Sequence, residues 1–331
     1  MYKPTSMAKV LAELGYEDRI AGMFTHVQLP FEPMPHQLWG LRYALEYPRS
    51  GVFFEPRTGK TLVLQLLAIY YAYYGTGTVQ IMPPALFRQF QHDYAEIRNH
   101  NLRIDVLNDG PAGRAKKLAL WEADPEQRPH IVLLSRDIFK SAWKNLYLMG
   151  FTNTHFDESH LGLQSEDSQI AKEIRAFIHQ NNSNRLVLST GTPIPNHVKN
   201  AYATLNLLLP EVYKTRGKFE QAHCVYETFY IPGKWGQPRA IQAISSYKNL
   251  DLLSQNLYSR SVYASKREVL NLEAPNIQIV ECDLKPTHRR LYNRVLNERL
   301  IELEEEVIDA RSAQKLRQVA LQLITVPEEF A

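Results

Sequence analysis

Between residues 50 and 210, short apolar runs alternate with longer amphipathic runs, and this alternation constrains the fold more than any other feature of the chain. Each apolar run has the length of a strand, and turn residues separate it from the helical pattern that follows. The expected strands cover 51–54, 78–82, 102–107, 130–134, 153–156 and 185–189, and the expected helices cover 61–74, 84–97, 112–123, 136–147, 167–180 and 197–209. Such alternation is typical of an α/β fold in which helices cover both faces of a mostly parallel sheet.

The bulk composition excludes several classes of protein before any motif is considered. Apolar residues make up 44% and charged residues 22% of the 331 residues, as in an ordinary globular chain. The formal net charge of +3 is too small to indicate nucleic-acid binding by itself. Two cysteines, Cys224 and Cys282, cannot build a disulfide framework, so we expect a reducing compartment. The N-terminus lacks a signal-peptide pattern and the apolar run 62–74 is too short to span a bilayer, so we expect a cytoplasmic chain with no membrane partner.

The chain divides into three expected parts. Residues 1–210 form the sheet lobe, which begins with a short amphipathic helix near the N-terminus. Residues 211–285 carry scattered aromatic, Gly and Pro residues with little periodicity until YKNLDLLSQNLY (247–258), which predicts an irregular extension that closes the lobe. Residues 286–331 are expected to form a protruding helix, because four apolar residues recur at helical spacing: Leu296, Leu300, Leu303 and Val307.

Three unusual short sequences follow three of the expected strands. They are EPRTGKT (55–61), DESH (157–160) and STGTP (189–193). In open parallel sheets, ligands bind beyond the carboxyl ends of the strands. We therefore expect these three turns to meet at one ligand site.

The first turn resembles a phosphate-binding P-loop. Backbone N–H groups of Thr58, Gly59 and Lys60, together with the N-terminus of the next helix, would surround phosphate oxygens. Lys60 would reach the β- and γ-phosphates of ATP, and the Thr61 hydroxyl would ligate Mg²⁺. The match is partial, because the full pattern has Gly where this chain has Phe54. The alternative interpretation is an ordinary Gly turn with a surface lysine.

The second turn offers the carboxylates that ATP hydrolysis needs. Asp157 would hold the Mg²⁺ shell, and Glu158 would orient and deprotonate the attacking water. One alternative is a solvated acidic turn. A second alternative is a zinc site with His155 and His160 as ligands, although their spacing is not His-Glu-x-x-His.

The third turn places small hydroxyl residues at a strand end. Ser189, Thr190 and Thr192 could hydrogen-bond to the carboxylates of the site or to bound water, and so sense the γ-phosphate. The alternative is a strand followed by a Gly-Pro turn, which requires neither threonine.

In this order, the three turns are similar to motifs I, II and III of superfamily 2 DNA helicases and translocases. Motif II is then a DExH box, and the Swi/Snf-like branch is the most similar one. PMPHQLWGLRYAL (33–45) resembles the Q motif, and IPNHVKNAYATLNLLLPEVY (194–213) resembles the segment after motif III. The resemblance covers most of the chain and implies the first RecA-like lobe of such a motor, of a phage or bacterial type.

The resemblance also assigns roles to single residues. Gln37 is implied to read the adenine, and Lys60, Asp157 and Glu158 are implied to be catalytic. Motifs II and III imply that four residues couple the nucleotide to DNA: His160, Ser189, Thr190 and Thr192. IMPPALFRQFQHDY (81–94) and LLSRDIFK (133–140) are similar to motifs Ia and Ib, which implies contacts of Pro83, Pro84, Ser135 and Arg136 with the backbone of duplex DNA.

One residue of motif I departs from the family pattern. Arg57 occupies a position where the family has Gly, which tolerates a positive φ that costs Arg energy. Because related ATPases carry an Arg-Thr-Gly-Lys-Thr variant, we expect the loop to work and include Arg57 among the nucleotide-binding residues.

A second departure is an absence from the sequence. Family members complete the site with a second RecA-like lobe that carries a Gln-x-x-Gly-Arg-x-x-Arg motif, and these 331 residues do not contain it. An arginine finger contributes about 10³–10⁵ in rate, so we expect this chain alone to bind ATP and to hydrolyse it poorly. The expected partners are DNA and a second lobe, from the same native chain or from another polypeptide, and the C-terminal end of the chain favours a fragment.

Three functions remain open at this point. The leading hypothesis is an ATP-driven translocase on double-stranded DNA. The alternatives are a strand-separating 3′–5′ helicase and a binding module that ATP gates without being hydrolysed.

Overall fold

The computed structural model describes most of the chain up to residue 270 and a few residues beyond it. The described residues are 5–15, 25–164, 168–181, 184–195, 197–232, 238–270, 278, 283–286, 289–290, 292–293, 300–302 and 307–309. The chain forms two compact units, Met1–Glu273 and Ala274–Ala331, which are described separately.

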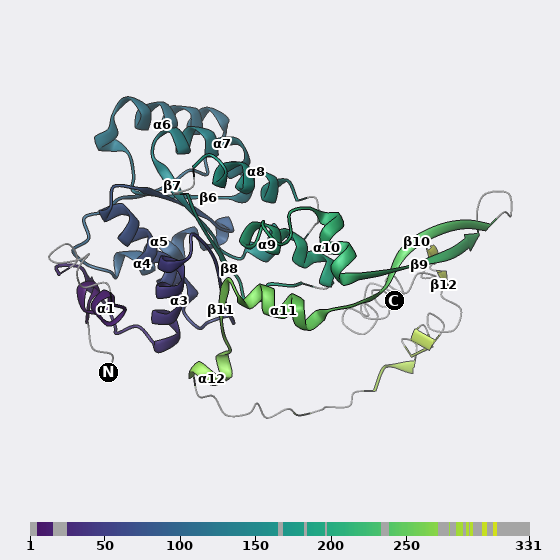
Figure 1. Cartoon of the computed structure of the whole chain (residues 1–331). Coiled ribbons are helices and arrows are strands. Elements are labelled where there is room, and N and C mark those ends of the chain that lie inside the picture. Colours follow the sequence, from purple (N-terminus) through teal and green to yellow (C-terminus); the bar gives the residue numbers. More distant parts are fainter. Residues whose placement is uncertain are drawn as a thin grey trace. The chain divides into compact units, whose positions relative to one another are not determined.

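A seven-stranded sheet is the centre of the first unit (Figure 1). Its strands are β3 (Arg49–Phe54), β4 (Gly77–Ile81), β5 (Ile104–Val106), β6 (Ile131–Leu134), β7 (Phe151–Phe156), β8 (Arg185–Ser189) and β11 (Ser261–Ala264). Their order is β11-β3-β8-β7-β4-β6-β5, and every neighbouring pair is parallel. The six strands expected from the sequence are confirmed, and their carboxyl ends share one edge of the sheet.

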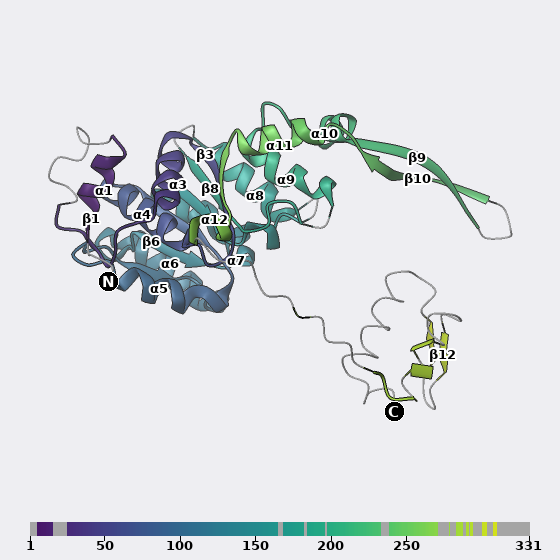
Figure 2. The ribbon, with the colours of Figure 1, turned by 90° about the horizontal axis from the view of Figure 1, so that it is seen from below.

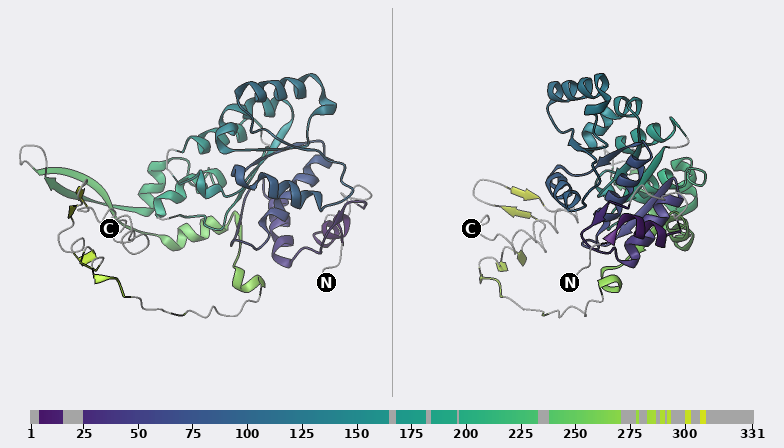
Figure 3. Two further views of the ribbon diagram at one scale, coloured as in Figure 1. Left: turned by 180° about the vertical axis from the view of Figure 1, so that it is seen from behind. Right: turned by 90° about the vertical axis from the view of Figure 1, so that its left-hand side faces the viewer.

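Helices cover both faces of the sheet, as the alternating pattern predicts (Figures 1 and 3). One face carries α3 (Pro35–Glu46), α4 (Lys60–Tyr73) and α5 (Phe87–Ala95), and the other carries α6 (Pro111–Ala123), α7 (Arg136–Leu148), α8 (Gln169–Ile178) and α9 (Ala201–Leu208). Short 3₁₀ turns are η1 (Pro84–Leu86), η2 (Pro125–Gln127), η3 (Ser159–Leu161) and η4 (Val198–Asn200). Helix α4 is apolar nearly all round because it is covered by α3 and α5 as well as by the sheet.

The N-terminal segment packs on the same side as α3. The expected amphipathic helix is α1 (Met7–Glu13), and the Ser6 side chain caps it by accepting a hydrogen bond from the Lys9 amide. Strand β1 (Thr5–Ser6) pairs antiparallel with β2 (Gln28–Leu29). Within the described residues, no helix is both long and apolar enough to cross a membrane.

The segment 211–270 is more regular than the sequence suggests. It contains α10 (Arg216–His223), a hairpin of β9 (Cys224–Pro232) and β10 (Pro238–Tyr247), α11 (Leu250–Tyr258), β11 and α12 (Lys266–Leu270). Within this unit the hairpin extends away from the sheet, as Figure 2 shows. The expectation of an irregular extension is therefore wrong for these residues, because helices and strands occupy most of them, and the β-branched and aromatic residues of CVYETFYIP favour the first strand of the hairpin.

A hydrogen-bonded group anchors the base of the hairpin. The buried His223 ring and the Tyr213 hydroxyl share a hydrogen bond of 2.8 Å, and the Asn256 amide donates to the same hydroxyl at 2.8 Å. This group ties α10 to α11, which flank the hairpin in the sequence, so the base of the hairpin is fixed on both sides.

Few residues of the second unit are described. Residues 286, 289, 290, 292 and 293 are helical, while β12 (Leu300–Glu302) pairs antiparallel with β13 (Val307–Asp309). The helix expected through Leu300 and Val307 is therefore wrong at these two strands, where the β-branched residues Ile301, Val307 and Ile308 suit extended backbone. Leu296, Leu303 and the remainder of the expected helix lie outside the described residues.

Candidate functional site

The turn between β3 and α4, residues 55–59, contains two residues with positive φ and is called the P-loop turn below, after the resemblance found in the sequence. Gly59 has φ 82° immediately before α4, and a Cβ atom there would lie 2.0 Å from Nε2 of Gln37. Arg57 also has a positive φ, 68°, which is the strained position that its place in motif I predicts. Its side chain is exposed and lines the cleft described below.

Lys60 is buried at the start of α4, with 7% of its surface exposed. Its ammonium donates to the carbonyl oxygens of Phe54 at 2.9 Å and of Glu55 at 3.3 Å. Burial lowers the pKa of Lys60, while the negative charges of Glu158 and Asp157 oppose this effect. The lysine is therefore not a surface residue of an ordinary turn, and it is held beside two carboxylates.

Two side chains of α3 form hydrogen bonds with the P-loop turn. His36 shares a hydrogen bond of 2.8 Å with the Thr58 carbonyl, to which the Gln37 amide also donates at 3.3 Å. The other end of the Gln37 amide accepts from the Met34 N–H at 2.8 Å. The Thr58 hydroxyl donates to the Glu55 carbonyl at 2.7 Å, so this side chain braces the turn from within.

Asp157 follows β7 and is 4% exposed. Its Oδ1 accepts hydrogen bonds from the Ser189 hydroxyl and from the Glu158 amide, each at 3.0 Å. Burial and, next, the charge of Glu158 raise the pKa of Asp157 to about 6, and the Ser189 hydrogen bond opposes them. Because β8 lies between β3 and β7, its terminal Ser189 joins the second and third turns.

A second set of contacts links Glu158 to the third turn. The His160 Nδ1 atom lies 3.3 Å from Oε2 of Glu158 and 2.8 Å from the hydroxyl of the buried Thr190. Thr192 is exposed and joins through its backbone N–H, which donates to the Thr190 hydroxyl at 3.0 Å. Three of the predicted coupling residues, His160, Thr190 and Thr192, are thus joined by hydrogen bonds, and the fourth, Ser189, binds Asp157.

Backbone strain also concentrates at this edge of the sheet. Glu158 has φ 47°, and the described non-Gly residues with positive φ are otherwise Arg57, Asn99, Asn101 and Asn249. Asn adopts this region readily, whereas Glu and Arg do not. Such strain is typical of sites where the backbone must aim a side chain or an N–H group.

A cleft of about 770 Å³ brings most of the predicted nucleotide-binding residues together, and we call it the Lys60 cleft. From the predicted set it is lined by Gln37, Arg57, Gly59, Lys60, Thr61, Asp157 and Glu158. Its volume is that of a pocket for an organic ligand of moderate size. Sequence reasoning missed other lining residues of the cleft, among them Gln89, Asp93 and Glu96, because the polar residues of α5 and its C-terminal end resemble an ordinary solvated surface.

The donor set of the Lys60 cleft fits Mg²⁺ and a triphosphate. The Thr61 hydroxyl and the Asp157 carboxylate are hard oxygen ligands, and Lys60, Arg57 and the α4 N-terminus supply positive charge. Among the described residues, no group of three or more His, Cys, Asp or Glu side chains is placed to hold a metal by protein ligands alone. His155, proposed as a zinc ligand, is completely buried within the sheet, and burial lowers its pKa to about 3.

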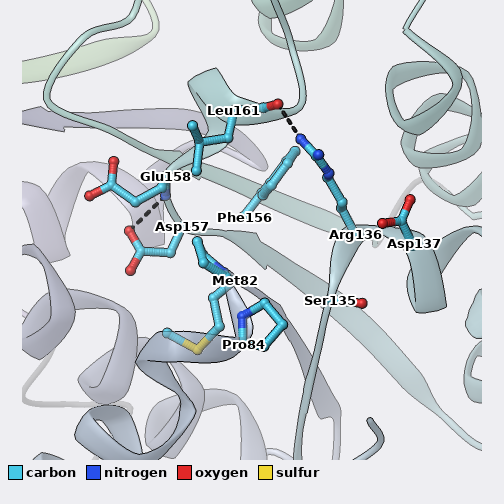
Figure 4. A pocket seen from close by; sticks show the side chains of 10 residues that line it. Met82, Pro84, Ser135, Arg136, Asp137, Phe156, Asp157, Glu158 and Leu161 are labelled. Atoms are coloured by element: carbon cyan, nitrogen blue, oxygen red, sulfur yellow. Dashed lines mark hydrogen bonds between the residues drawn. The ribbon is translucent and has the colours of Figure 1, made fainter. Parts of the chain in front are cut away.

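A second hollow, of about 300 Å³, lies on the other side of Asp157 and Glu158 (Figure 4). We call it the Arg136 hollow, and it is lined by Met82, Pro83, Pro84, Ser135, Arg136, Asp137, Phe156, Asp157, Glu158 and Leu161. The four residues predicted to contact DNA are therefore gathered here. Two of them have contacts within the chain, since Ser135 caps α7 by accepting from the Ile138 amide and Arg136 donates to the Leu161 carbonyl.

Comparison with known proteins agrees with this arrangement. The SNF2-related domain matches residues 36–328. The chain is 27% identical over 227 residues to the ISWI chromatin-remodeling complex ATPase CHR17 of Arabidopsis thaliana. The aligned segment covers 63% of this chain and 19% of that protein. It is 32% identical over 91 residues to the Homo sapiens SWI/SNF-related matrix-associated actin-dependent regulator of chromatin subfamily A member 1, which covers 27% of this chain and 8% of that protein.

A solved structure shares the fold. The Sulfolobus solfataricus SWI2/SNF2 ATPase core in complex with dsDNA superposes with a TM-score of 0.52 at 15% identity, over 88% of this chain and 57% of that chain. The chain spans less than a fifth of the length of the two curated relatives named above. Both are eukaryotic, so the expected phage or bacterial type has no support from them.

Proposed function

Because the chain belongs to the SNF2-related domain family, we propose that it is the nucleotide-binding lobe of a DNA-dependent ATPase motor of superfamily 2. One observation carries the proposal: Lys60, Asp157 and Glu158 line one cleft, and Ser189 is bound to Asp157 at 3.0 Å. Three turns that are far apart in the sequence thus meet at one edge of the sheet. The Arabidopsis thaliana relative is the ATPase of an ISWI chromatin-remodeling complex, which supports ATP as the nucleotide.

Different residues of the Lys60 cleft would bind different parts of ATP. Lys60 leaves the Phe54 and Glu55 carbonyls to contact the β- and γ-phosphates, and the N–H groups at the start of α4 contact the remaining phosphate oxygens. Gln37 lies beside the turn, where its amide nitrogen donates to the Thr58 and Gly59 carbonyls, and it would read the adenine with the remaining acceptor capacity of its Oε1 atom.

Thr61 and Asp157 would hold Mg²⁺, which neutralises charge that develops on the phosphates. Glu158 orients the attacking water and accepts its proton, and His160 fixes the position of that carboxylate. Because His160 also binds Thr190, a change at Glu158 is passed to the turn after β8. This link is the proposed route from the γ-phosphate to the DNA contacts.

DNA and a second lobe complete the proposed motor. The Arg136 hollow opens beside the catalytic carboxylates, so a phosphate backbone bound at Ser135 and Pro84 would lie close to Glu158. The second lobe would supply the arginine finger of the Gln-x-x-Gly-Arg-x-x-Arg motif, which these 331 residues do not contain. Such an arginine raises the rate of hydrolysis by about 10³–10⁵.

The proposal is tested by measuring ATP hydrolysis by the purified chain, with and without duplex DNA and with and without a polypeptide that carries a second lobe. We expect slow hydrolysis by the chain alone and stimulation when DNA and the second lobe are both present. A chain that binds ATP and hydrolyses it in none of these mixtures would instead be the ATP-gated module. Displacement of a labelled strand from duplex DNA would identify a strand-separating helicase.

A further inference from the structure

Glu55, the first residue of the P-loop turn, joins that turn to a distant part of the chain. Its N–H donates to the Ala264 carbonyl at 3.0 Å. Its own carbonyl accepts from the Thr58 hydroxyl at 2.7 Å and from the Lys60 ammonium at 3.3 Å. The backbone of Glu55 therefore pairs with β11 through its N–H and holds the Lys60 ammonium through its carbonyl.

Both carboxylate oxygens of Glu55 are bound by the segment that follows β11. Oε1 accepts from the Tyr263 hydroxyl at 3.0 Å, and Oε2 accepts from the Lys266 N–H at 2.8 Å. The Lys266 amide and, next, the Tyr263 hydroxyl lower the pKa of Glu55, so the side chain is a charged acceptor at neutral pH. Hydrogen bonds to a charged group are stronger than those between neutral groups.

The register of the sheet places these donors opposite Glu55. Strands β11 and β3 are parallel, with Val262 beside Val52 and Ala264 beside Phe54. The bonds of Glu55 continue this pairing beyond the ends of both strands. Helix α12 follows directly, as Figure 1 shows, and Ser265 caps it by accepting from the Glu268 amide at 3.3 Å.

We propose that Glu55 is a positioning residue of the nucleotide site, which holds the P-loop turn in its binding path through Tyr263 and Lys266. This inference rests on the proposed binding of ATP at Lys60. A turn that is fixed before ATP arrives loses less conformational entropy on binding than a turn that ATP must order. Freeing Glu55 therefore weakens ATP binding, although Glu55 itself does not contact the nucleotide.

Two tyrosines of this surface provide a matched pair of variants. Tyr263 and Tyr258 are both partly exposed, at 45% and 43%, and their rings lie 6.1 Å apart. Tyr263→Phe removes the hydroxyl that binds Glu55. Tyr258→Phe removes the same group from a neighbouring ring and leaves the Glu55 carboxylate with both donors.

The test is a calorimetric titration of the whole chain with Mg·ATP, for the unchanged chain, both Tyr→Phe variants, Glu55→Gln and the double variant Glu55→Gln/Tyr263→Phe. We expect Tyr263→Phe to weaken binding about five-fold, Glu55→Gln to weaken it at least as much, and Tyr258→Phe to have no effect. In the Glu55→Gln background, Tyr263→Phe should add less than it does in the unchanged chain, because the neutral amide keeps one acceptor oxygen for two donors.

Unfolding temperatures without nucleotide separate positioning from stability. The inference would be overturned if Tyr263→Phe lowered the unfolding temperature but left the affinity for Mg·ATP unchanged. It would also be overturned if the effects of Tyr263→Phe and Glu55→Gln on that affinity were fully additive. Since Tyr263 is half-exposed, its variant keeps the test valid if Glu55→Gln does not fold. An unchanged chain that fails to bind Mg·ATP would contradict the nucleotide site itself, and the role of Glu55 with it.

Discussion

The Lys60 cleft and the Arg136 hollow share Asp157 and Glu158 but differ in how their cations are held. In the Lys60 cleft, a buried ammonium rests on two carbonyls beside two carboxylates. In the Arg136 hollow, an exposed guanidinium binds the Leu161 carbonyl, and the other lining residues include two prolines and the helix cap Ser135. The first arrangement suits a small, highly charged ligand that is desolvated on binding, and the second suits a solvated phosphate backbone.

This contrast indicates how one pair of carboxylates could lie between the two proposed ligands, ATP and DNA. Asp157 faces the sheet and is fixed by Ser189, whereas Glu158 has a strained backbone and a side chain that is held by His160. Variants on each side should therefore affect one ligand and spare the other, and variants of the shared pair should affect hydrolysis.

The largest effect is expected for Glu158→Gln, which keeps the shape of the side chain and removes its ability to accept a proton. Hydrolysis by the chain with its second lobe should fall by about 10²–10⁴, the usual contribution of a general base. Affinity for ATP, measured by calorimetry, should change little. Hydrolysis at the unchanged rate would show that another group deprotonates the water.

Lys60→Ala should weaken Mg·ATP binding at least about 100-fold, because it removes the buried charge that would face the phosphates. Lys116→Ala is the control, since Lys116 is exposed on α6. The comparison of the two sites also predicts that DNA affinity, measured by fluorescence anisotropy, is the same for Lys60→Ala and the unchanged chain. Equal ATP affinity in Lys60→Ala and Lys116→Ala would remove the lysine from the site.

Arg136→Ala should give the opposite result, a loss of roughly ten-fold in DNA affinity with ATP affinity unchanged. Each phosphate contact contributes modestly, so the slope of log affinity against log salt should also fall by about one. Arg114→Ala on α6 is the matched control. If Arg136→Ala weakens ATP and not DNA, the arginine acts on the DESH turn through Leu161 and does not contact DNA.

The smallest effect concerns pH and Asp157. Burial and the charge of Glu158 raise its pKa to about 6, so protons compete with Mg²⁺ and binding of Mg·ATP weakens as the pH falls through about 6. The raised pKa also affects folding. The folded state binds the proton of Asp157 more tightly than the unfolded state, so the free energy of unfolding of the ligand-free chain falls as the pH rises from about 4 to about 6.

Ser189→Ala removes a hydrogen bond that favours the charged form of Asp157. The midpoint of the Mg·ATP binding profile should therefore move upward by about 0.7 pH unit, which corresponds to about 1 kcal/mol. Ser141→Ala, on α7, is the control. A midpoint that stays in place or moves downward would show that Asp157 does not set the pH dependence.

Much of this site could be predicted from the sequence, because its turns follow local rules. Strand periodicity located the ends of β3, β7 and β8, and parallel strands bring their carboxyl ends to one edge, so the meeting of Lys60, Asp157 and Ser189 followed. The positive φ of Arg57 followed from its place in a turn that has Gly in the family. The individual hydrogen bonds of Gln37 and His160 could not be predicted from the sequence, because they depend on side-chain rotamers.

The contacts of Glu55 could not be predicted, for a physical reason. Strand β11 has only the four residues SVYA and pairs with β3 across some two hundred residues of chain. Periodicity within four residues cannot separate a strand from a turn, and nothing local indicates the partner. The hairpin β9–β10 was missed for a different reason, because its strand signal was overlooked: the sequence of β9, CVYETFYIP, is rich in the β-branched and aromatic residues that favour strands.

The most direct test of the account is a crystal structure of the Glu158→Gln chain grown with ATP and Mg²⁺. We expect Lys60 Nζ to have left the Phe54 and Glu55 carbonyls for the β- and γ-phosphates, with the metal between Thr61 and Asp157. A triphosphate bound elsewhere, or a Lys60 cleft that stays without nucleotide while ATP is bound in solution, would contradict the account.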